Sequence, residues 1–155
     1  MKGTMVRETF DPASWRTLQT APLWVFSALV GRQSDFHPWE EQAFRTAVEE
    51  SAAVSAGLAA EVLASLSTDR EELVDAYAHE GRPIVSGLRD ALALLAMRDA
   101  SMAVDFAGAL LDVAERLATA RGPFGRMISE EDGEILQLLA EVLEVEPPRG
   151  RGGQP

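Results

Sequence analysis

Apolar residues in this chain recur at spacings of three and four, and this periodicity constrains the fold more than any other feature. Hydrophobic residues make up 46% of the 155 positions, and they fall on stripes such as Leu88, Leu92 and Leu95. A stripe at this spacing marks one face of an α-helix, whereas a half-buried strand alternates at every second residue. No stretch of strand length alternates in this way with β-branched enrichment. The sequence therefore predicts an all-α fold.

Prolines, glycines and capping residues divide the chain into about seven predicted helices. Proline favours the first helical position, and a Ser or Thr three residues before an acid can form a capping box. On these signals, helices begin near Pro12, Pro22, Pro38, Thr68, Ile84, Asp99 and Ser129. The helix from Pro38 either continues or breaks between Ser51 and Gly57. We predict one compact bundle over residues 1–145, followed by a disordered tail rich in Pro, Gly and Arg over residues 146–155.

A weak internal helix-loop-helix duplication runs through this pattern. An apolar helix, an irregular loop and an acid-started helix occur over residues 23–50 and again over residues 111–145. We expect the two units to pack against each other, because each has an apolar face to bury. The predicted core consists of Phe26, Leu29, Phe44, Val113, Leu117, Ile135 and Leu139. Met97 and Met102 are expected to fill gaps in that core.

Composition excludes several classes of protein. The net charge is −11, and no basic patch with interleaved aromatics occurs, so nucleic-acid binding is not expected. The longest apolar run covers residues 21–31, which is shorter than the roughly 20 residues that a membrane-spanning helix needs. Cysteine is absent, which removes disulfides and thiolate metal sites and suits a reducing compartment. We therefore expect a cytoplasmic protein without a membrane span.

The densest group of potential ligands lies at the first loop and the helix start that follows it. Asp35, Glu40 and Glu41 offer carboxylate oxygens of the kind that Ca²⁺ or Mg²⁺ prefers, and His37 would suit a transition metal. The alternative is that these acids only stabilise the helix start through its dipole. In that case Glu41 pairs with Arg45 one turn later. No cofactor is fixed by the sequence.

Two aromatic residues in the same segment are candidate contacts for a protein partner. Phe36 and Trp39 flank the start of the predicted helix. A large ring there either covers the core as a staple or stays exposed as an anchor for a partner. The sequence leaves both alternatives open.

Standard catalytic patterns are missing. The chain has two histidines, and neither His37 nor His79 follows a Glu by three residues, as a di-iron bundle requires. There is no nucleophile elbow, phosphate-binding glycine loop or zinc-protease motif. Asp75 lies one helical turn before His79, which predicts a hydrogen bond and not a catalytic pair. A protein-binding domain is favoured; the alternative is an enzyme whose acidic site is assembled from distant helices.

With both units located, the chain resembles the tellurite-resistance TerB-like family of small bacterial all-helical domains. The segment SALVGRQSDFHPWEEQAF is similar to that family's helix, Asp-Gly-type loop and acid-started helix, and LLDVAERLATA leads to ISEEDGEILQLLAEVLEV in the second half. The first loop departs from the family, since Ser34-Asp35-Phe36 stands where Asp-Gly is common, and the second loop has no acid.

The resemblance covers about residues 23–145 and implies a non-enzymatic cytosolic domain in stress or metal-related responses. Such a domain would work through protein contacts and a cation. Only Asp35, with Glu40 or Glu41, matches the positions that would hold the ion.

Titration with Ca²⁺ or Mg²⁺ tests the cation site. Binding should shift amide signals over residues 34–41 and leave residues 122–128 unchanged, with a dissociation constant of about 10⁻⁴ to 10⁻³ M because few carboxylates are available. Asp35→Ala should abolish the shifts. Equal shifts in that variant, or none at millimolar metal, would leave these acids as a helix-capping cluster only.

Overall fold

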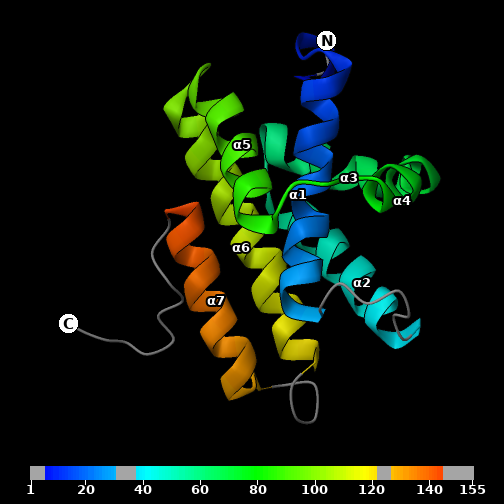
Figure 1. The fold of residues 1–155 in the computed structure, drawn as a ribbon, viewed down its shortest axis with the longest axis vertical. Coiled ribbons are helices and arrows are strands. Elements are labelled where there is room, and N and C mark those ends of the chain that lie inside the picture. Colours follow the sequence, from blue (N-terminus) through cyan, green and yellow to red (C-terminus); the bar gives the residue numbers. More distant parts are fainter. Residues whose placement is uncertain (1–5, 31–37, 122–126, 145–155) are drawn as a thin grey trace.

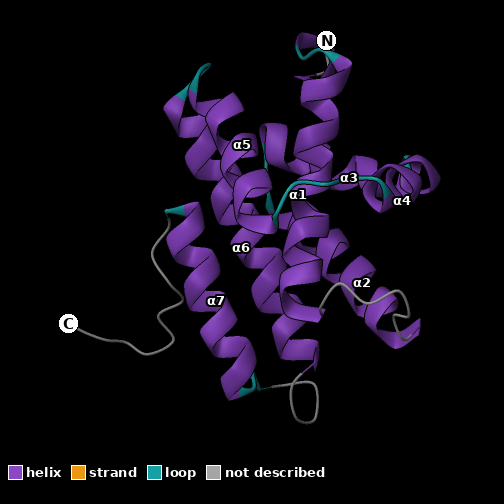
Figure 2. Ribbon diagram, viewed as in Figure 1, coloured by secondary structure: helices purple, strands orange, loops and turns teal. Residues whose placement is uncertain are grey.

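The computed structural model describes residues 6–30, 38–121 and 127–144, and these form helices connected by short turns. After a 3-10 turn at Val6–Thr9, the seven α-helices are α1 (Pro12–Val30), α2 (Pro38–Val54), α3 (Gly57–Thr68), α4 (Arg70–Ala78), α5 (Ile84–Ala96), α6 (Ala100–Arg121) and α7 (Glu130–Leu143). Their arrangement is drawn in Figure 1. The described ranges contain no strand (Figure 2), so the predicted fold class is confirmed. The predicted tail, residues 146–155, lies outside them.

Helix α6 lies at the centre of the bundle. It packs against α1, α2, α3, α5 and α7. Around it, α3 and α4 lie to the right of α1 in Figure 1, and α5 and α7 lie to the left. Its inward side chains have no exposed surface: Phe106, Leu110, Val113 and Leu117 are each 0% exposed. Burial of this apolar face is the main source of stability for the bundle.

The predicted core is confirmed. Five of its seven members are buried, and the other two, Phe44 and Ile135, are partly buried and pack against the same cluster. The two echoed units meet as expected, because α6 packs against both helices of the first unit and α7 packs against α1. Within the first unit, the rings of Phe26 and Phe44 lie 4.7 Å apart. Met102 also packs on the core, but Met97 follows the end of α5 and is 85% exposed, so its predicted burial is wrong.

The predicted helix start at Pro22 is wrong, because α1 continues through this residue. An interior proline removes one helical hydrogen bond and costs about 3 kcal/mol. Leu18, Trp24 and Val25 flank it and are completely buried, which offsets that cost. The undecided break after α2 is real, and Gly57 takes a φ of +60° there. The two helices predicted from Pro12 and Pro22 are one helix, and the helix predicted from Pro38 is two, so the described residues still form seven α-helices.

Three of the predicted helix starts show side-chain caps, and one of them is Asp99, whose carboxylate accepts hydrogen bonds from the backbone N–H and the hydroxyl of Ser101. The Asp11 carboxylate accepts hydrogen bonds from both the backbone N–H and the hydroxyl of Ser14. The Ser129 hydroxyl accepts one from the N–H of Asp132 at 3.1 Å. The predicted capping box at Thr68 is wrong: α3 runs through this residue, and the next residue precedes α4.

Close contact between α1 and α5 depends on a glycine. Trp24 is fully buried, and a Cβ added to Gly87 would lie 2.3 Å from its ring carbon Cζ2. The Arg82 guanidinium also lies over the Trp24 ring, with its central carbon 5.1 Å from the ring centroid, within cation–π range. The ring is therefore held between α5 and the α4–α5 connection.

Gly87→Ala should destabilise the protein, because the added methyl group overlaps the Trp24 ring. We expect a loss of about 1 to 3 kcal/mol in the free energy of unfolding, as for other overpacked cores, measured by urea denaturation. Gly108→Ala is the control: nothing lies within 4 Å of its added Cβ, so this helical position should gain about 0.5 to 1 kcal/mol. Equal stability of the two variants would contradict the close contact.

Candidate functional site

One of the three acids expected to bind a cation, Glu40, forms an ion pair with an arginine of the chain itself. Arg121, in the last turn of α6, donates from Nη1 to Glu40 Oε2 and from Nε to Asp132 Oδ2, both at 2.9 Å. Glu40 is in the first turn of α2 and Asp132 in the first turn of α7. They are only 9% and 3% exposed. The two acid-started helices of the duplication thus converge on one guanidinium.

Of the other residues predicted in this segment, the structure describes only Glu41 and Trp39. Asp35, His37 and Phe36 lie outside the described residues. Glu41 is exposed and pairs with Arg70 at 3.4 Å, so the predicted alternative pairing with Arg45 is not the contact observed. No group of three or more His, Asp or Glu side chains suited to a metal occurs within the described ranges. The cation at Asp35 stays a prediction.

The remaining predicted contacts can be placed directly. Trp39, in the first turn of α2, is 51% exposed, so the alternative in which it fills the core is wrong. His79 Nδ1 lies 3.1 Å from the backbone carbonyl oxygen of Asp75. The expected hydrogen bond therefore uses the main chain and not the Asp75 carboxylate.

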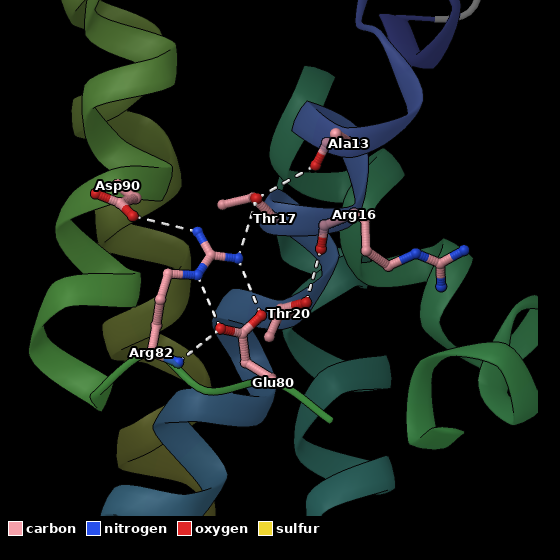
Figure 3. A network of polar contacts seen from close by, with 7 residues as sticks. All are labelled: Ala13, Arg16, Thr17, Thr20, Glu80, Arg82 and Asp90. Carbon is pink, nitrogen blue, oxygen red and sulfur yellow. Dashed lines mark hydrogen bonds and ion pairs between the residues drawn. The ribbon is translucent and has the colours of Figure 1, made fainter. Parts of the chain in front are cut away.

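A second arginine orders the connection between α4 and α5 (Figure 3). Arg82 donates to both carboxylate oxygens of Glu80, at 2.8 and 3.0 Å. It also donates to Asp90 on α5 at 3.2 Å and to Thr17 on α1 at 3.4 Å. The hydrogen bonds that Arg82 donates to Glu80 are the main cause of the raised pKa of Arg82. One side chain therefore ties the connection to two helices.

A groove of about 900 Å³ is lined by α1, α2, α3 and α4. We call it the α2–α4 groove. Its longest wall is one face of α2, formed by Glu41, Phe44, Arg45, Val48, Glu49 and Ala52. These residues follow the helical spacing from position 41 to position 52, or about 16 Å of helix axis.

The floor and the opposite wall of the α2–α4 groove are mainly apolar. Helix α3 contributes Leu63 and Leu66, which are buried, and Ala64, which is exposed. Val74 on α4 lines the groove although it is 57% exposed. Because an exposed valine and small exposed residues lie beside a buried apolar floor, the groove offers apolar area to whatever enters it.

Polar contacts hold the helices around the α2–α4 groove. Ser27 Oγ on α1 and Tyr77 Oη on α4 lie 2.5 Å apart. The Glu41–Arg70 pair links α2 to α4, and Glu80, which also lines the groove, is held by Arg82. Glu41 and Glu80 are therefore both paired with arginine. The groove has an apolar interior and charged side chains at its rim.

Comparisons with known proteins give no relative: no family model, no curated protein and no solved structure matches the chain. Among the described helices, none is both long enough and apolar enough to cross a membrane.

Sequence reasoning missed Arg121. It stands in the last turn of a helix, where a cation is favoured by the dipole, and the next predicted helix begins with three acids. That combination was a usable signal for Asp132. Its second partner is 81 residues away, and no local pattern indicates it.

Arg121→Met should destabilise the protein by about 3 kcal/mol, because it removes the cation that two buried carboxylates share. Thermal and urea denaturation measure the change. The exposed Arg89→Met is the control and should stay within about 0.5 kcal/mol of the parent.

Adding Glu40→Gln and Asp132→Asn to Arg121→Met should recover much of the loss, since no charge then remains unpaired. No recovery in this combined variant would mean that the cost of Arg121→Met is lost packing and not lost charge pairing.

Proposed function

We propose that this chain is a non-enzymatic protein-interaction domain that binds a helix of a protein partner in the α2–α4 groove. The observation that carries the proposal is the open apolar groove along one face of α2. Binding an amphipathic helix in a hydrophobic groove is a recurrent mode of recognition, in which side chains at i, i+3, i+4 and i+7 supply the anchors.

The size of the groove supports a helix as the ligand. A helix is about 10 Å across with its side chains. Half of such a cylinder, about 16 Å long, has a volume of about 600 Å³. The groove volume of about 900 Å³ therefore accommodates the apolar half of a three-turn helix.

The exposure of the groove favours a macromolecular ligand over a small one. Pockets for small molecules usually bury roughly 70–90% of the ligand surface. Here Val74 is 57% exposed, and Ala64 and Ser67 are also exposed along the groove. A small apolar molecule would keep much of its surface in water, whereas a helix would present its polar face there.

The alternative, an enzyme with an acidic site, receives less support. An enzyme site would gather acids from distant helices, and the described chain does bring Glu40 and Asp132 together. These two carboxylates share Arg121 and are nearly inaccessible to solvent. The acids linking the walls of the groove are likewise paired with arginine. Binding through apolar contacts needs none of these groups to react.

The setting follows from the sequence expectations. We propose a cytosolic domain, in keeping with the absence of cysteine. The stress-related role and the cation at Asp35 remain what the TerB-like resemblance implies. The proposal of helix binding in the groove does not depend on either of them.

Affinity purification from the native cell tests the proposal when variants are compared. Ala64→Arg places a large charged side chain at an exposed position that lines the groove. The partner should no longer be recovered with this variant. Ala96→Arg, at an exposed position on α5, should retain it. Both substitutions are on helix surfaces, where effects on stability are usually within about 0.5 kcal/mol, which denaturation checks.

Recovery of the same partners by the parent protein, by Ala64→Arg and by Ala96→Arg would contradict groove binding. Partners lost only from Ala96→Arg would place the interaction on the other side of the molecule.

A further inference from the structure

Charged residues form a regular row along the α2 wall of the groove. Glu41, Arg45 and Glu49 are spaced by four residues and all line the α2–α4 groove. On a helix, positions four apart lie on the same face, about 6 Å along the axis. The wall therefore presents negative, positive and negative charge in sequence beside an apolar floor.

We propose that the partner helix carries the complementary row, basic, acidic and basic, at positions i, i+4 and i+8 beside its apolar stripe. This inference rests on the proposed function. Because the row on α2 reads the same in both directions, the pattern fits a partner helix that runs parallel or antiparallel to α2. Charge complementarity of this kind fixes register and selects among partners more than it adds affinity.

The two acids of the row are accessible to a partner, and Arg45 between them is partly exposed. Glu49 is exposed, and the Glu41–Arg70 pair has side chains 51% and 49% exposed. Such an exposed ion pair contributes only about 0 to 1 kcal/mol. A basic residue of the partner can therefore exchange with Arg70 at little cost.

The charge pattern also argues against a second copy of this chain as the occupant. No segment of the sequence has Lys or Arg at i and i+8 with Asp or Glu at i+4. The chain contains 14 basic against 25 acidic residues, so its surface as a whole attracts a basic partner. A different protein with a basic amphipathic helix fits better than self-association.

Binding of designed peptides tests the row. Two labelled helical peptides share an apolar stripe of four leucines at helical spacing and differ in the adjacent row, which is Lys-Glu-Lys in one and Glu-Lys-Glu in the other. Compensating charges on the opposite face of each peptide give both the same net charge. Fluorescence anisotropy should show about tenfold tighter binding of the Lys-Glu-Lys peptide at low salt, since three weak pairs replace three repulsions. High salt should reduce the difference.

Charge reversal in the protein makes the test specific. Arg45→Glu should lose the preference for Glu at the centre of the peptide row and favour a Lys-Lys-Lys peptide. Arg89→Glu, at an exposed position on α5 outside the groove, should leave the preference of the parent unchanged.

The outcomes separate this inference from the proposed function. Equal affinity of the two peptides, with both lost in Ala64→Arg, overturns the charge row and leaves the groove as a helix site. No groove-dependent binding of either peptide, or self-association that Ala64→Arg abolishes, overturns the inference. In those cases the purification of native partners still decides the proposed function.

Discussion

Burial of α6 is the constraint on which the rest of the structure depends. This helix packs against five others, and its inward residues are completely excluded from water. Helix α4 packs instead on α1 and α3. The central helix α6 therefore does not cover the apolar surface that lies beside α4. The α2–α4 groove lies at this position, so the open site is a consequence of how the core is assembled.

Arginine holds the junctions of this acidic protein. Arg121 joins α6 to the first turns of α2 and α7, and Arg82 joins the α4–α5 connection to α5 and α1. Arg116 on α6 pairs with Glu50 on α2 at 3.2 Å. Guanidinium groups suit these positions because each can bind two or more acceptors in fixed directions. The chain has 25 acids and only 14 basic residues. Each of these three arginines lies where two acids meet.

Much of the fold is predictable from helical spacing, and the functional surface is not. Helical spacing predicts Leu117 and Leu139 in the core, and both are buried. The local preference of proline predicts a helix start at Pro22, but packing of the neighbouring residues decides, and α1 continues through it. The spacing of Phe44 and Val48 is equally typical of a covered face and of a groove wall. Periodicity shows that a face is apolar, but only the tertiary arrangement shows what covers it.

The most direct test of groove binding is site-specific photo-cross-linking in the native cell, with a photoreactive aromatic amino acid in place of Ala64 or of Ala96. The account predicts a covalent adduct with a different polypeptide from position 64 and none from position 96. Mass spectrometry should place the partner's attachment site in an amphipathic helix. Adducts only from position 96, or adducts from position 64 only with a second copy of this chain, would contradict it.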